Sequence, residues 1–95
     1  MGDTMSRTCQ LIRYAGEVQG VGFRYTAMRL AGGFDVAGYV KNLPDGQVEL
    51  LVEGDSEQVQ AYLQALKDRM GAYIQNVHQE VCPANGTLKG FDIRF

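Results

Sequence analysis

A glycine-rich stretch at residues 16–24, GEVQGVGFR, carries the groups best suited to chemistry. Glycines between a strand and a helix let successive backbone N–H groups point inward and form an anion-binding nest. The N-terminus of the following helix adds unpaired N–H donors and about half a positive charge. Arg24 falls in the first turn of that expected helix, where the helix dipole opposes a cation. An anion held between the loop and the guanidinium would explain an arginine in this place, because a guanidinium forks onto two phosphate oxygens.

The same stretch also fits a plain strand–helix connection with Arg24 directed to solvent. Glycine-rich connections are common, so the loop alone supports both interpretations equally. The familiar nucleotide patterns are absent: Tyr25 stands where GxGxxG would require its last glycine, and no glycine precedes a Lys-Ser or Lys-Thr pair. The stretch therefore indicates an anion site without a nucleotide-binding motif.

Hydrophobic periodicity predicts five strands and two helices around this stretch. The strands are expected at residues 8–15, 34–43, 47–53, 72–82 and 91–95. The first helix begins near Phe23 and stops at Gly32-Gly33. The second begins at Asp55, with Gln58 three residues later resembling a capping box, and Gly71 ends it.

The resulting order is βαββαβ with a short fifth C-terminal strand. Apolar stripes on both helices need one sheet face to cover, which predicts an α+β fold built as a two-layer α/β sandwich. Right-handed crossovers make the first two strands parallel with another strand between them, the ferredoxin-like arrangement. The C-terminal ends of those two strands then share one sheet edge, so the glycine loop and Asn42 should be neighbours. Ligands of open α/β sheets tend to bind at such strand ends.

Length and composition predict a single domain over residues 8–95 after a flexible N-terminal segment, residues 1–7. A net charge of -2, with Lys and Arg scattered singly, argues against a nucleic-acid partner. The longest apolar runs, such as residues 48–52, are too short to span a bilayer, and no secretory leader is evident. Cys9 and Cys82 lack metal-ligand spacing, so reduced thiols in a cytoplasmic protein are expected.

Other polar residues have simpler interpretations. His78 is expected in the middle of a strand away from the loop, and Asp45 belongs to a tight turn. Glu17 should face solvent, because a carboxylate directed at bound phosphate would repel it. Cys9 and Cys82 should lie close together on the sheet face away from the helices, because their strands are expected to be antiparallel neighbours. No carboxylate or histidine cluster indicates a metal site.

Two long motifs resemble one known family. Residues 16–24 resemble the first acylphosphatase signature, a glycine followed by VQGV and a phenylalanine–arginine pair. Residues 38–54, GYVKNLPDGQVELLVEG, are similar to the second signature. Both occur in the expected order and spacing, and the resemblance covers nearly the whole chain. Two long motifs at the right separation are far more specific than either alone.

The resemblance implies a role for each matching position. Arg24 corresponds to the arginine that binds the substrate phosphate, and Asn42 to the asparagine that orients the attacking water. The phosphate cradle corresponds to the backbone of Gln19, Gly20, Val21, Gly22, Phe23 and Arg24. Leu43 departs from members that have threonine after the asparagine, so the sequence does not support a water relay through a hydroxyl there.

The function implied is hydrolysis of the carboxyl–phosphate bond of acyl phosphates by a monomer that needs no metal or cofactor. A carboxylate is a good leaving group, so positioning and charge stabilisation suffice without a general acid. One alternative is a non-catalytic anion-binding module on the same fold, which would have no use for a water-positioning amide. A second is a ferredoxin-like RNA binder, which requires exposed aromatic side chains on its central strands, whereas the third strand here is QVELLVE.

Overall fold

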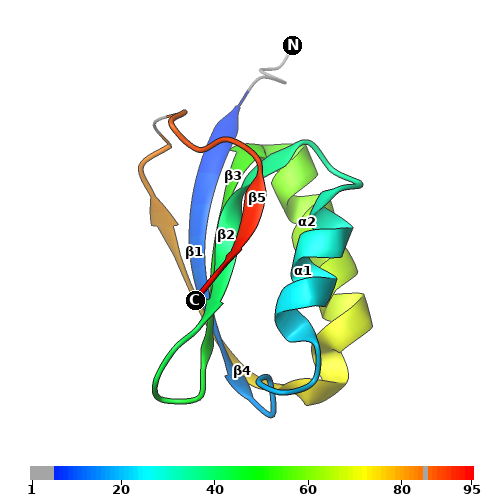
Figure 1. Ribbon diagram of the computed structural model, residues 1–95. Coiled ribbons are helices and arrows are strands. Elements are labelled where there is room, and N and C mark those ends of the chain that lie inside the picture. The colour runs from blue at the N-terminus through cyan, green and yellow to red at the C-terminus, as the bar shows by residue number, and fades with distance from the viewer. Residues whose placement is uncertain (1–5, 85) are drawn as a thin grey trace.

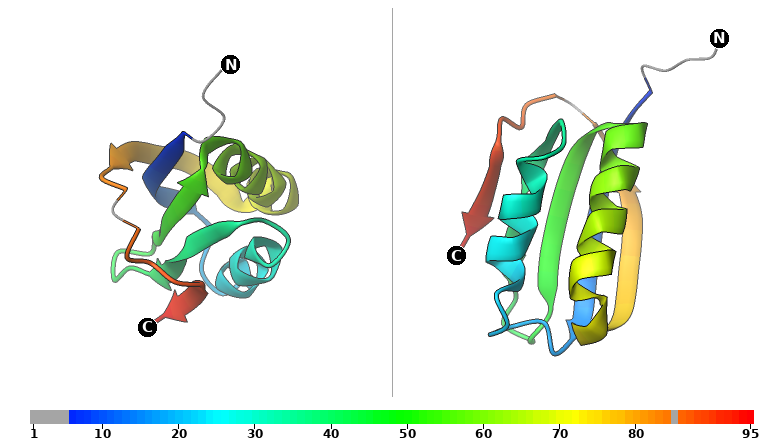
Figure 2. Two further views of the ribbon diagram at one scale, coloured as in Figure 1. Left: turned by 90° about the horizontal axis from the view of Figure 1, so that it is seen from above. Right: turned by 90° about the vertical axis from the view of Figure 1, so that its right-hand side faces the viewer.

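The computed structural model describes residues 6–84 and 86–95, which form one sheet with two helices on one of its faces (Figures 1 and 2). Its elements are β1 (Arg7–Gly16), α1 (Phe23–Ala31), β2 (Val36–Asn42), β3 (Val48–Asp55), α2 (Ser56–Met70), β4 (Ile74–Cys82) and β5 (Phe91–Arg94). Residues 1–5 of the predicted flexible segment lie outside the described residues, and the division into segment and domain stays a prediction. No helix within the described residues is long and apolar enough to cross a membrane.

The strands of the described chain are ordered β4-β1-β3-β2-β5. β3 is antiparallel to both β1 and β2, so β1 and β2 are parallel to each other with β3 between them. β4 pairs antiparallel with the outer side of β1, and β5 pairs parallel with β2. This topology confirms the predicted α+β, ferredoxin-like sandwich. It also brings the connection after β1 and the turn after β2 to the same end of the sheet (Figures 1 and 2).

The core lies between the sheet and the two helices. Alternate strand residues reach it, as the period of a half-buried strand requires: Ile12, Tyr14, Val40, Val48, Leu50 and Val52. α1 contributes Phe23 and Ala27, and α2 contributes Tyr62 and Leu66 at helical spacing. The buried Tyr62 hydroxyl donates to the Ala27 carbonyl oxygen at 2.9 Å and so fixes α2 against α1. Burial raises the pKa of Tyr62, which keeps this donor protonated.

Two predicted details are wrong. Residues 71–73 form a 3-10 turn and β4 begins only at Ile74, because the last turn of α2 tightens before the chain becomes extended. Gln58 does not complete a capping box with Asp55, whose side chain makes no capping hydrogen bond within the described chain. The Gln58 side-chain oxygen instead accepts from the backbone N–H of Asp35 at 2.8 Å. It thereby satisfies a donor in the connection between α1 and β2 rather than in its own helix.

The two cysteines are directly opposed on β1 and β4. Their sulfur atoms lie 2.7 Å apart, and both are free thiols. Cys9 is buried although it lies outside the core between sheet and helices. The predicted proximity of the two thiols is therefore confirmed.

Candidate active site

A cavity of about 270 Å³ opens where β1 ends and α1 begins. The loop side is formed by Val18, Gly20 and Gly22, and the first turn of α1 supplies Phe23, Arg24 and Tyr25. Asn42, the last residue of β2, completes the lining. The glycine loop and Asn42 are thus neighbours, as the topology predicted.

Backbone conformation explains why glycines occupy this loop. Gly20 has φ 82° and Gly22, the N-cap of α1, has φ 80°. An L-residue with a side chain would pay about 1–2 kcal/mol to adopt this left-handed conformation. A Cβ at either position would meet nothing within 4 Å, so the backbone angle and not crowding selects glycine. Val18 and Phe23 are buried on either side of these glycines and fix the loop to the core.

Arg24 is the second residue of α1, as the sequence predicts. The first turn contains no acidic residue and the N-cap makes no side-chain bond, so no carboxylate of that turn competes for an anion. The guanidinium carbon lies 4.8 Å from the centre of the Phe95 ring. That distance is within the range of a cation–π contact, which restricts where the side chain can lie. The helix terminus and Arg24 therefore present positive charge to the same cavity.

Gln19 connects the loop to the turn that follows Asn42. Its side-chain nitrogen donates to the carbonyl oxygens of Leu43 and Gln47, both at 2.9 Å. The backbone N–H of Gln47 in turn donates to the Asp45 carboxylate at 3.0 Å, which confirms the turn role predicted for Asp45. These bonds hold the loop after β1 against the turn after β2. They also set the position of Arg24 relative to Asn42.

The structure separates the predicted site residues into two groups. Gly20, Gly22, Phe23, Arg24 and Asn42 line the cavity within the described chain, whereas Gln19 and Val21 do not. Gln19 directs its side chain to the turn, and Val21 packs against the core.

Two lining residues were not predicted, Val18 and Tyr25. Tyr25 follows Arg24 directly, and its place in the first turn of the helix could have indicated it. Among the residues set aside, Glu17 is exposed and His78 lies on β4, as expected.

Comparison with known proteins identifies the same family as the two motifs. The family model described as Acylphosphatase matches residues 10–93. The chain is 39% identical over 83 residues to an acylphosphatase of Methanospirillum hungatei, a match that covers 82% of this chain and 89% of that protein. It is 44% identical over 63 residues to an acylphosphatase of Listeria welshimeri, covering 66% of this chain and 68% of the relative. The crystal structure of acylphosphatase from Bacillus subtilis superimposes with a TM-score of 0.83 at 30% identity, covering 93% of this chain and 99% of that one. The chain belongs to the acylphosphatase family.

Proposed function

We propose that this chain hydrolyses acyl phosphates to a carboxylate and inorganic phosphate, with Arg24 holding the phosphate and Asn42 orienting the water. The observation that carries the assignment of roles is the shared cavity of Arg24, Asn42 and the two left-handed glycines. Membership of the acylphosphatase family supports the reaction itself. The substrate is a small molecule.

Three features would each contribute to binding the phosphate group. Loop N–H groups around Gly20 and Gly22 can point at its oxygens, because glycine permits the required backbone angles. The N-terminus of α1 contributes a positive partial charge. Arg24 contributes a full charge with two parallel donors, which suits the equatorial oxygens on which negative charge resides during phosphoryl transfer.

Asn42 has the correct chemistry to place the attacking water. An amide offers an oxygen acceptor and two N–H donors, so it can fix both the position and the orientation of a water molecule. The water oxygen forms a bond to phosphorus while the bond between phosphorus and the acyl oxygen breaks. The carboxylate leaves with the electron pair, one proton of the water stays on the attacking oxygen, and the other passes to a phosphate oxygen. No general acid is required, because the leaving group is stable as an anion.

The net charge and the cysteines bear on the partners and location of the chain. The net charge of -2 does not favour a polyanion, so we propose that no nucleic acid is bound. We further propose that the chain acts as a monomer. The two free thiols support a reducing compartment, the cytoplasm.

A pair of substrates tests the reaction. Benzoyl phosphate, which releases a carboxylate, should be hydrolysed, whereas benzyl phosphate, which must release an alkoxide, should not be. Inorganic phosphate should inhibit competitively, because it occupies the same loop. Phosphate binding without turnover of benzoyl phosphate would contradict the proposal and identify a non-catalytic anion-binding module instead. Equal hydrolysis of both substrates would show that a general acid had been missed.

A further inference from the structure

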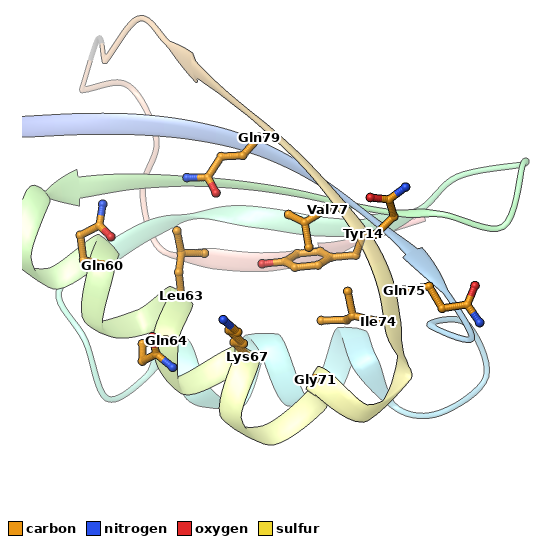
Figure 3. Close-up of a pocket in the computed structure, with 11 residues that line it drawn as sticks. Tyr14, Gln60, Leu63, Gln64, Lys67, Gly71, Ile74, Gln75, Val77 and Gln79 are labelled. Carbon is orange, nitrogen blue, oxygen red and sulfur yellow. The ribbon is translucent and has the colours of Figure 1, made fainter.

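A second and larger cleft lies between α2 and β4, with a volume of about 530 Å³ (Figure 3). It forms because α2 packs on β1 and β3, which leaves β4 beyond the helical layer with residues 75–81 all exposed. The volume falls within the range of about 300–1,000 Å³ that is usual for small-molecule sites. Within the described chain, this cleft shares no lining residue with the cavity of Arg24 and Asn42.

Tyr14 is a buried residue whose hydroxyl group is accessible at the floor of the cleft. The residue is only 5% exposed, and its ring is held by contact with the Phe23 ring, 5.1 Å between centroids. Figure 3 shows the hydroxyl directed from β1 toward the face of α2 that carries Leu63 and Lys67. This hydroxyl has no hydrogen-bond partner among residues 6–84 and 86–95. It is not sealed inside the protein, because every fully enclosed side-chain polar atom of the described residues has a partner. Its donor and acceptor capacity is therefore available to a molecule in the cleft.

The walls of the cleft define the chemistry of that molecule. Lys67 on α2 is the one charged residue among the described lining residues, so the cleft favours a single negative charge. Amide side chains from both walls offer acceptors: Gln60 on α2, and Gln79 on β4, whose Nε2 donates to Gln10 Oε1 at 3.1 Å. Leu63, Ile74 and Val77 place apolar surface beside these amides.

A carboxylate suits this cleft better than a phosphate. Lysine offers one point charge on a flexible stem, and the left-handed glycines of the cradle, Gly20 and Gly22, lie in the other cavity. We propose that the cleft between α2 and β4 is a second binding site, for a small organic carboxylate that carries an amide or hydroxyl group on an apolar body. The Lys67 ammonium pairs with the carboxylate, and the Tyr14 hydroxyl bonds to the amide or hydroxyl group. Leu63, Ile74 and Val77 cover the apolar part.

The probe that tests this proposal is N-acetyl-L-leucine, which has one carboxylate, one amide and one branched apolar side chain. It is titrated to millimolar concentration into ¹⁵N-labelled protein, with inorganic phosphate saturating throughout so that the Arg24 site is occupied. Amide resonances of α2 and β4 should shift and saturate together. The uncharged analogue N-acetyl-L-leucinamide should bind roughly three- to tenfold more weakly, the scale of one exposed charged contact.

Two variants of cleft residues and one control variant distinguish specific binding in the cleft from nonspecific association. Tyr14→Phe removes only the hydroxyl and keeps the ring against Phe23, and it should weaken probe binding roughly three- to tenfold. Lys67→Gln should weaken it to a similar extent, whereas Lys89→Gln, an exposed lysine outside the cleft, should not. All three variants should hydrolyse benzoyl phosphate at the parent rate, which shows that they fold.

Three results would overturn the proposal. The first is the absence of saturable shifts, or shifts confined to residues 19–24. The second is equal affinity for the probe and its uncharged analogue. The third is parent-like binding by both Tyr14→Phe and Lys67→Gln.

Discussion

Arg24 and Asn42 border one cavity of about 270 Å³, although Arg24 lies in the first turn of α1 and Asn42 at the end of β2. They meet because β1 and β2 are parallel with β3 between them, so the C-terminal ends of both strands lie at the same end of the sheet. The Gln19 side chain then joins the two connections through the carbonyl oxygens of Leu43 and Gln47. The fold thus places a guanidinium beside an amide, the two groups to which we assign phosphate binding and water orientation.

Substitution of Arg24 tests the phosphate cradle. Arg24→Ala should reduce kcat/KM for benzoyl phosphate at least about a thousandfold, the upper scale for loss of one transition-state donor, since a full charge is lost as well. Phosphate should no longer inhibit at millimolar concentration. The kcat/KM of Arg24→Lys should lie between the values of the parent and of Arg24→Ala, because lysine keeps the charge but loses the two-pronged contact. Arg29→Ala, an exposed arginine in the last turn of the same helix, should retain parent activity. Parent-like phosphate inhibition of Arg24→Ala would rule out the assigned role.

Gln19 is predicted to act as a positioning residue. Gln19→Met keeps the length of the side chain but removes the donor that bonds to the Leu43 and Gln47 carbonyl oxygens. Two lost hydrogen bonds of about 1 kcal/mol each should loosen the loop and lower kcat/KM roughly tenfold or more. The measurement pairs steady-state kinetics with thermal unfolding. A loss of activity that merely tracks a loss of folded protein would show that Gln19 supports stability and not the site.

Activity should vary little across neutral pH. A guanidinium keeps its charge and an amide does not titrate in this range, so neither proposed residue changes its charge. His78, the only histidine of the chain, lies on β4 and does not line the described cavity. We therefore expect a nearly flat profile of kcat/KM between about pH 5 and pH 8. We also expect full activity in the presence of a chelator. A bell-shaped profile centred near neutrality would reveal a catalytic acid or base, and inhibition by the chelator would reveal a metal.

The thiol pair gives a pH dependence of a different kind. Burial, followed by the neighbouring Cys82, raises the pKa of Cys9 from 9.0 to about 12. The thiolate is the reactive form, so Cys9 should react with a disulfide reagent at neutral pH at least about a hundredfold more slowly in the folded chain than in urea. Because folding favours the protonated thiol, the stability that this group contributes is present below about pH 9 and is lost as pH rises toward 12.

The experiment on the thiols uses Cys82→Ser, so that the rate belongs to Cys9 alone, and repeats the measurement at rising pH. The rate in the folded protein should climb toward the urea value as the pH rises above 9, and it should do so at a lower pH than the parent pKa of about 12 would require, because the contribution of Cys82 to the raised pKa of Cys9 is absent. Titration of the parent under non-reducing conditions should find both thiols free. A parent protein without free thiols would show that Cys9 and Cys82 are joined by a disulfide.

Much of the fold could be predicted from the sequence because local signals agreed with the tertiary arrangement. Alternation predicted a strand at residues 8–15, which is observed as β1 (Arg7–Gly16), and Gly32 and Gly71 ended the two helices where expected. The capping box at Gln58 failed for a physical reason. A local motif specifies which donor is near in sequence, whereas the Asp35 N–H comes near only after the chain has folded.

Some features of the site could likewise be predicted from local sequence, and others could not. Arg24 and the glycines could be predicted because helix position and backbone angle follow from local sequence. The role of Gln19 could not be predicted, because its partners Leu43 and Gln47 are brought to it by the pairing of distant strands. The same limit applies to the cleft at Tyr14, which exists only because β4 extends beyond α2.

Asn42→Ala separates the two proposed roles, because it removes the amide that we propose orients the water and leaves Arg24 and the glycine loop unchanged. Steady-state hydrolysis of benzoyl phosphate is measured together with the inhibition constant of inorganic phosphate. We expect kcat to fall by about three to four orders of magnitude, a scale within what positioning can supply, while the phosphate inhibition constant stays within about twofold of the parent. A kcat near the parent value would contradict the role of Asn42, and so would a loss of phosphate binding as complete as that of Arg24→Ala.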